Sequence, residues 1–138
     1  MSKAVIVLIP LVIIGVLVVG GFGLYNGLVS AQEEVKAAWA QVENQYQRRA
    51  DLIPNLVETV KGYAQQEKGV LEEVTRLRSQ WGEARQSGDI NKSLQAAQGM
   101  EGALGRLMVV VERYPELKSN VNFMKLQDQL EGTENRIA

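Results

Sequence analysis

The chain has 138 residues, with 15 lysine and arginine side chains against 16 aspartate and glutamate side chains and a net charge of −1 at pH 7. A charge so close to balance gives no reason to expect nucleic acid or an anionic membrane surface as a partner. The sequence contains neither histidine nor cysteine, so it lacks the commonest general base, the commonest transition-metal ligand and any thiol. These absences argue against an enzyme, and we expect no catalytic residue, metal, cofactor or small-molecule substrate.

The N-terminal segment is a long run without charge. No charged side chain follows Lys3 until Glu33, and the stretch from Ala4 to Leu24 is apolar. As a helix this stretch would be about 32 Å long, which is enough to cross a bilayer. A cleaved signal peptide is the alternative, with Val29-Ser30-Ala31 as its cleavage site, but the apolar core of a signal peptide is shorter. We therefore predict a membrane anchor over residues 1–27 in a single-pass protein of the cell membrane.

Glycines at the end of the anchor are a candidate packing site. Gly23 and Gly27 form a small-xxx-small pair, at which two membrane helices could approach closely. Glycine is also common in membrane helices for other reasons, so the pair alone does not establish an interface. Basic residues are few on both sides of the anchor, and they do not decide its orientation.

Residues 28–138 are predicted to form one all-α domain, because apolar residues recur at alternating spacings of three and four. No flexible linker precedes this pattern, so we expect the anchor and the first helix of the domain to be continuous. Pro54 disfavours a helical conformation at Ile53. We therefore expect the first helix to end there in a tight reversal, with a kinked continuation as the alternative. The first apolar stripe consists of Leu28, Ala31, Val35, Ala38, Val42 and Tyr46.

A second helix is expected to run without interruption from Leu56 to Ala84. Asn55 and Glu58 have the spacing of a capping pair at its start. Ser87-Gly88 would end this helix, because glycine is favoured just beyond a helix C-terminus. Asp89 would then cap the third helix.

The third helix is expected from Ile90 to Val111, before Tyr114-Pro115 stops it. Ser119 or Asn120 would cap a fourth helix. Four amphipathic helices joined by short turns predict an antiparallel, up-down-up-down four-helix bundle with long helices and a short last helix. The apolar residues of the fourth helix are Phe123, Leu126, Leu130 and Ile137.

Two acidic residues, Glu67 and Glu101, fall on otherwise apolar seams. Glutamates inside helical bundles can hold a pair of metal ions. If the chain turns between Gln86 and Asp89, however, the two carboxylates lie about 10 Å apart along the bundle. We therefore expect each glutamate to reach the rim of the bundle or to accept a hydrogen bond.

The sequence resembles the LemA family over nearly its whole length. Tyr25-Asn26-x-Leu28-Val29 directly follows the anchor, and the run from Arg48 to Val57 reads RRADLIPNLV, which is long and specific. Four further segments carry the resemblance: Ala38-Trp39, Lys61-Gly62-Tyr63-Ala64, Tyr114-Pro115-Glu116-Leu117-Lys118 and the residues from Glu131 to Ala138.

This resemblance implies a bacterial single-pass membrane protein with a mostly antiparallel helical bundle and no established enzymatic activity. Some family members are encoded beside an HtpX-like membrane metalloprotease, and one is linked to magnetosome membranes. Others resemble lipoproteins with a cysteine before the Tyr-Asn pair, which favours a domain outside the cytoplasm; this chain has Gly21-Phe22-Gly23 there. Family members usually continue beyond Arg-Ile-Ala, so we expect a truncated chain or a short last helix that leaves apolar surface uncovered as a candidate interface.

We therefore expect a membrane-anchored helical scaffold that self-associates and organises membrane or envelope proteins without chemistry of its own. Its expected partners are the lipid bilayer and further copies of the chain, as a homo-oligomer. The alternative is an adaptor or regulator of an HtpX-like membrane protease in envelope quality control, with that protease or another envelope protein as partner. The charged cluster from Arg48 to Asp51 could bind a partner or could be a charged turn. The candidate interaction residues are Gly23, Tyr25, Asn26, Gly27, Arg48, Arg49, Asp51 and Pro54.

Overall fold

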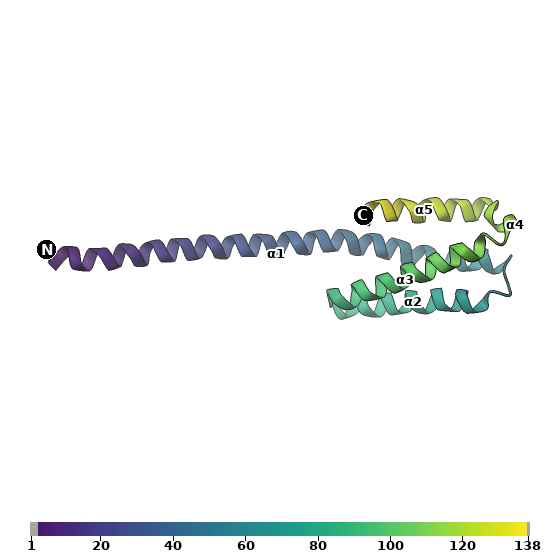
Figure 1. Ribbon diagram of the computed structural model, residues 1–138, viewed down its shortest axis with the longest axis horizontal. Coiled ribbons are helices and arrows are strands. Elements are labelled where there is room, and N and C mark those ends of the chain that lie inside the picture. The colour runs from purple at the N-terminus through teal and green to yellow at the C-terminus, as the bar shows by residue number, and fades with distance from the viewer. Residues whose placement is uncertain (1–2, 138) are drawn as a thin grey trace. The chain divides into compact units, whose positions relative to one another are not determined.

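The computed structural model describes the backbone of residues 3–137 and the side chains of residues 7–137, and every regular element in this part of the chain is helical (Figure 1). This confirms the all-α class. The helices are α1 (Lys3–Lys61), α2 (Lys68–Ser87), α3 (Ile90–Val111), α4 (Pro115–Lys118) and α5 (Val121–Ile137).

The chain divides into two compact units, Met1–Gln41 and Val42–Ala138, and α1 contributes residues to both. In the first unit the apolar side chains from Val7 to Leu24 are exposed within the part of the chain that the structure describes. Among the described helices, α1 is the one that is long and apolar enough to cross a membrane. The division of the chain into an anchor at 1–27 and a domain at 28–138 stays a prediction.

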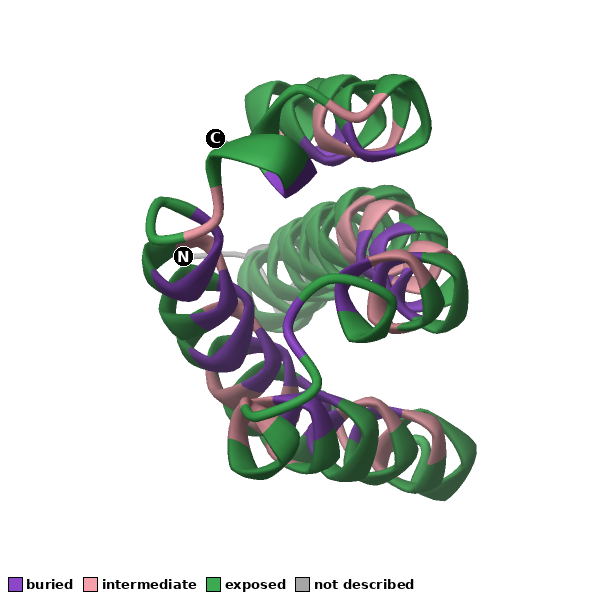
Figure 2. Cartoon of the chain, turned by 90° about the vertical axis from the view of Figure 1, so that its right-hand side faces the viewer, coloured by how far each residue is buried: buried purple, intermediate pink, exposed green. Residues whose placement is uncertain are grey.

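The hydrophobic core lies in the second unit, and all five helices contribute to it. In Figure 2 the residues coloured as buried lie on the sides of these helices that are turned toward one another, and exposed residues lie on the outer sides. Burying each large apolar side chain contributes about 1.5–3 kcal/mol relative to leaving it in water. The largest fully buried side chains are Trp81, Phe123, Ile53, Leu56, Met100, Leu107, Leu117, Val60 and Val74.

The reversal expected at Ile53-Pro54 is wrong, because α1 continues through both residues to Lys61. Ile53 and Leu56 face the core and are almost fully buried. Proline inside a helix removes one backbone hydrogen bond, but the burial of these side chains and a substitute hydrogen bond described below offset that loss. The alternative expectation, a helix that continues past Pro54, is the one the structure supports.

The uninterrupted second helix is wrong for the same reason. The break falls between Lys61 and Lys68, so Asn55 lies inside α1 and does not cap a helix. At the end of α1 the N–H groups of Tyr63 and Ala64 both donate to the carbonyl of Val60, which closes the last turn. Ala64 is buried in the core, which holds the connection between α1 and α2 in place.

The turn between α2 and α3 has the predicted form. Gly88 adopts a left-handed conformation with φ of 69°, which glycine reaches at little cost. The Asp89 carboxylate accepts hydrogen bonds from the N–H groups of Asn91 and Lys92 at 2.9 and 3.2 Å. A Cβ on Gly99 would lie 3.3 Å from the Leu77 side chain, so glycine at that position allows α2 and α3 to approach closely.

The last part of the chain contains one helix that the sequence did not indicate. Pro115 stops α3 as expected, but it also begins the short α4, because proline suits the first position of a helix. Asn120 then caps α5, where its side-chain oxygen accepts from the Phe123 N–H at 3.1 Å. The expected cap of the last helix is thereby confirmed.

Candidate functional site

A buried polar cluster in the second unit surrounds Arg49. The residue is only 6% exposed, and its side chain contacts residues of α3 and α5. Arg49 Nη1 is 2.7 Å from Glu101 Oε1 on α3, and Arg49 Nε donates to Thr133 Oγ1 on α5 at 3.1 Å. A longer ion pair of 3.8 Å joins Arg49 to Glu134. Arg49 therefore ties α1 to α3 and α5, and its charge is used within the chain.

Tyr46 lies one turn before Arg49 on α1 and belongs to the same cluster. Its ring packs against Trp81 with centroids 5.5 Å apart. Burial raises the pKa of the Tyr46 hydroxyl, and the nearby Glu101 carboxylate raises it further, while the Arg49 guanidinium opposes the change. The cluster thus favours the neutral form of the Tyr46 side chain.

Pro54 leaves one carbonyl of α1 without its usual donor, and Arg78 of α2 supplies a replacement. A helical carbonyl normally accepts from the N–H four residues later, but Pro54 has no N–H to offer Ala50. Arg78 Nε donates to the Ala50 oxygen at 2.9 Å. The same proline that favoured a break in the sequence therefore creates a specific contact between α1 and α2.

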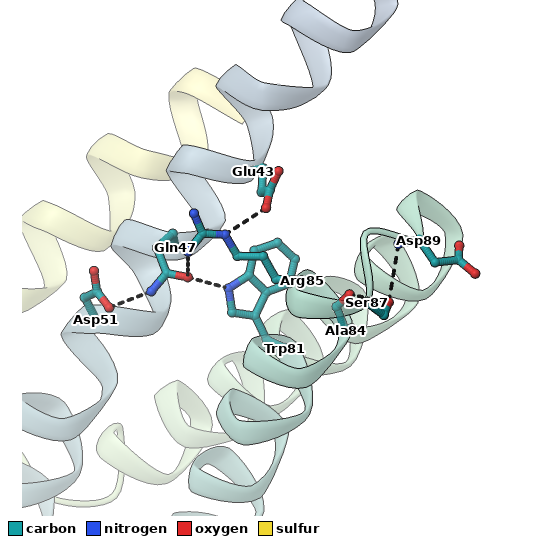
Figure 3. Close-up of polar contacts among 8 residues, drawn as sticks. All are labelled: Glu43, Gln47, Asp51, Trp81, Ala84, Arg85, Ser87 and Asp89. Carbon is teal, nitrogen blue, oxygen red and sulfur yellow. Dashed lines mark hydrogen bonds and ion pairs between the residues drawn. The ribbon is translucent and has the colours of Figure 1, made fainter.

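A second polar network joins α1 and α2 next to the hydrogen bond between Arg78 and Ala50 (Figure 3). Gln47 is at its centre, because its side-chain oxygen accepts from Trp81 Nε1 at 3.2 Å and from Arg85 Nη1 at 3.1 Å. Gln47 in turn donates to Asp51 at 2.8 Å, which fixes the direction of the amide. Arg85 also pairs with Glu43 at 2.7 Å.

The two acidic residues on apolar seams both have hydrogen-bonding partners, as expected. Glu101 pairs with Arg49. Glu67 lies between α1 and α2, where it pairs with Arg113 at 3.1 Å and accepts from the Tyr114 hydroxyl at 3.3 Å. No group of three or more acidic, histidine or cysteine side chains within residues 7–137 is arranged to hold a metal ion.

The structure separates the candidate interaction residues into an exposed and a buried set. Arg49 is buried, so a partner that approached this part of α1 would meet the exposed Arg48, Asp51 and Pro54 instead. The candidates near the predicted anchor all lie on α1 and are exposed: Gly23, Tyr25, Asn26 and Gly27.

An apolar stripe continues along α1 beyond the anchor without cover from this chain. Leu28 is 71% exposed and Val35 is 64% exposed. Glu33 and Lys36, which pair with each other at 2.9 Å, lie on neighbouring turns. Charged side chains do not lie in the hydrocarbon core of a bilayer at low cost, so we expect Glu33 and Lys36 to lie outside it.

Sequence reasoning missed the residues that join the helices across long distances in the chain. Arg78, Arg85 and Thr133 look like ordinary surface or capping residues when they are read in order along the sequence. Each is paired with a residue of α1 that is at least 28 positions away. For Arg78 a signal existed, because a proline within a helix leaves one carbonyl without its donor.

Comparisons with known proteins give one family and one group of relatives. The model of the LemA family matches residues 38–138. The chain is 30% identical over 137 residues to magnetosome protein MamQ 2 of Paramagnetospirillum magneticum, and 28% identical over 137 residues to magnetosome protein MamQ of Magnetospirillum gryphiswaldense. Each alignment covers 83% of this chain and 50% of the relative, so the chain spans about half the length of the curated relatives it matches.

Proposed function

Because this chain belongs to the LemA family, we propose that it is a membrane-anchored helical scaffold whose copies associate through α1 and organise other membrane or envelope proteins. In this proposal residues 1–27 hold the chain in the cell membrane, and the second unit is an antiparallel four-helix bundle outside the cytoplasm. The description of the two relatives as magnetosome proteins supports a membrane location. The buried network around Arg49 joins three helices, which supports a structural role for the bundle.

The observation that carries the proposal is the exposed stripe on α1. Leu28 and Val35 are seven residues apart, as are Ala31 and Ala38, and this repeat is typical of helices that pair along a left-handed seam. Parallel copies anchored in one bilayer present the same residues at the same height. A second copy therefore covers the stripe in register, with no offset between the chains.

The glycines at the end of the anchor support the same mode of association. A side chain added at Gly23 or Gly27 would meet nothing within 4 Å in this chain, so both positions are open to a neighbouring helix. Small residues there allow two membrane helices to approach closely. In this proposal the anchors contact one another at these glycines, in addition to the contact along the stripe, which lies on a neighbouring face of the same helix.

Single-cysteine cross-linking tests this proposal cleanly, because the chain has no cysteine of its own. Leu28→Cys and Val35→Cys lie on the stripe, whereas Glu33→Cys and Ala40→Cys lie on the opposite side of α1. A disulfide forms only where the two Cα atoms come within about 7 Å. In zwitterionic liposomes, mild oxidation should therefore give covalent dimers at the first two positions and little at the others.

Two outcomes would count against the proposal. Equal cross-linking on both sides of α1 would indicate random collision in the bilayer. A chain that gives no dimer at any position but co-purifies with a membrane protease would support the adaptor alternative instead. Labelling of a cysteine at Arg48 in intact cells with a membrane-impermeant maleimide would test the extracytoplasmic location separately.

A further inference from the structure

A groove of about 800 Å³ lies along the outer face of the contact between the end of α1 and the first half of α2. Its apolar floor is formed by Val57 of α1 and Leu71 of α2, of which Leu71 is only 6% exposed. Lys61 lies on the α1 side, and Lys68 and Arg76 lie on the α2 side. The groove belongs entirely to the second unit.

The groove carries positive charge that the chain does not use. None of Lys61, Lys68 and Arg76 forms an ion pair in the described part of the chain, where seven ion-pair contacts bind other cations. Glu72 is the one acidic residue that lines the groove. Three cations against one carboxylate leave the groove with a clear positive excess.

The position of Lys68 adds a separate argument. Lys68 is the first residue of α2, and the first turn of this helix contains no acidic residue. A cation at a helix N-terminus is unfavourable, because the helix dipole is positive there. Stability alone would favour aspartate or glutamate at this position, so the lysine is better explained by something that the groove binds.

We infer that this groove is a docking site for an acidic amphipathic helix of a partner protein. Lys68 and Arg76 are two turns apart on α2, about 12 Å along its axis, and the buried Leu71 lies between them. A partner helix laid along α2 pairs with both cations when its acidic residues are also two turns apart. An apolar side chain between those acidic residues then enters the groove over Leu71, as in other helix-in-groove complexes.

The shape of the site favours a helix over a lipid surface. Leu71 is recessed below the charged side chains, so a flat bilayer would meet the lysine and arginine ends and leave the apolar floor uncovered. A helix of about three turns reaches the floor and both cations together. The inference does not depend on self-association, because none of the residues of the groove lies on the proposed α1 interface.

The test uses the full chain in neutral detergent micelles and a fluorescein-labelled helical peptide of about three turns. The peptide carries two glutamates two turns apart with a leucine between them, and fluorescence anisotropy measures its affinity. Lys68→Glu together with Arg76→Glu should weaken binding by about tenfold or more, since both ion pairs are replaced by repulsion. Glu72→Gln should strengthen binding by about twofold, because it removes the one repulsive charge.

Matched controls keep the result specific to the groove. Lys92→Glu together with Lys125→Glu makes the same change in net charge at exposed cations elsewhere, and it should leave the affinity within about twofold of the wild type. A peptide with lysines in place of its glutamates should bind the Lys68→Glu, Arg76→Glu protein and not the wild type. An acid at position 68 suits the start of α2, and an unchanged helical circular dichroism spectrum of the double variant separates a loss of binding from a loss of folding.

Three results would overturn the inference. The first is an equal loss of peptide affinity in the groove variant (Lys68→Glu, Arg76→Glu) and in the control variant (Lys92→Glu, Lys125→Glu). The second is a leucine-to-serine peptide that binds as well as the original, since the floor would then have no role. The third is that the protein does not bind the peptide but binds vesicles with anionic lipid, and that this vesicle binding depends on Lys68 and Arg76. That result would assign the groove to a membrane surface.

Discussion

Replacing Arg78 by methionine tests why α1 continues through Pro54. Methionine keeps an apolar stem of similar length but removes the donor to the Ala50 carbonyl, which is 2.9 Å away in the native chain. A buried carbonyl without a partner costs about 1–3 kcal/mol, and Ala50 is almost fully buried. Because Arg78 is itself partly exposed and water has some access, we expect a loss of about 1–2 kcal/mol in the free energy of unfolding.

The same substitution in a Pro54→Ala background isolates the mechanism. Alanine at position 54 restores the N–H that the Ala50 oxygen lacks, so Arg78→Met should then cost less than about 0.5 kcal/mol. The coupling between the two changes should be about 1 kcal/mol. Urea unfolding in neutral micelles, followed by tryptophan fluorescence, gives the four free energies, with the nearby exposed Arg76→Met as control. Equal losses in the two backgrounds would refute the role of Pro54 in creating this contact.

Three further predictions concern the core and its turns. Arg49→Met should lower the free energy of unfolding by about 2–3 kcal/mol. This loss is smaller than for a fully buried ion pair, because Glu101 is partly exposed. As a control, Arg48→Met at an exposed position should change the free energy of unfolding by less than about 0.5 kcal/mol. Because the pKa of Tyr46 is raised in the folded state, its contribution to stability is fully present below the ordinary value of 10.0 and is lost as the pH rises above that value. Tyr46→Phe should therefore flatten the fall in the free energy of unfolding as the pH rises above 10.0. Gly88→Ala should cost about 1 kcal/mol in urea unfolding, because φ at this position is 69°; a neutral effect would mean that the turn rearranges.

The sequence was sufficient for elements whose signals are local. Gly88 and Asp89 end α2 and begin α3 by interactions within a few residues, so their residue types predict the turn directly. The start of α5 at Asn120 is predictable in the same way. The apolar periodicity also predicted the bounds of α3, Ile90–Val111, because a helix of 22 residues repeats its pattern many times.

The sequence failed where distant residues override a local preference. Pro54 favours a break, and only the Arg78 contact and the burial of Ile53 explain why α1 continues to Lys61. The prediction of Arg49 as a candidate interaction residue failed for the same reason. Two adjacent arginines look alike in sequence, yet one is exposed and the other is paired with Glu101 and Thr133, and only the packing of α3 and α5 distinguishes them.

The most direct test of the proposed function is the number of chains in each assembly in a bilayer. Native mass spectrometry of the full chain, released from lipid nanodiscs, measures this number without a cross-linker. Association through α1 predicts dimers or larger assemblies for the wild type, and a shift to single chains when Leu28 and Val35 are both replaced by serine. A wild-type chain that is monomeric at every protein-to-lipid ratio would contradict the proposal.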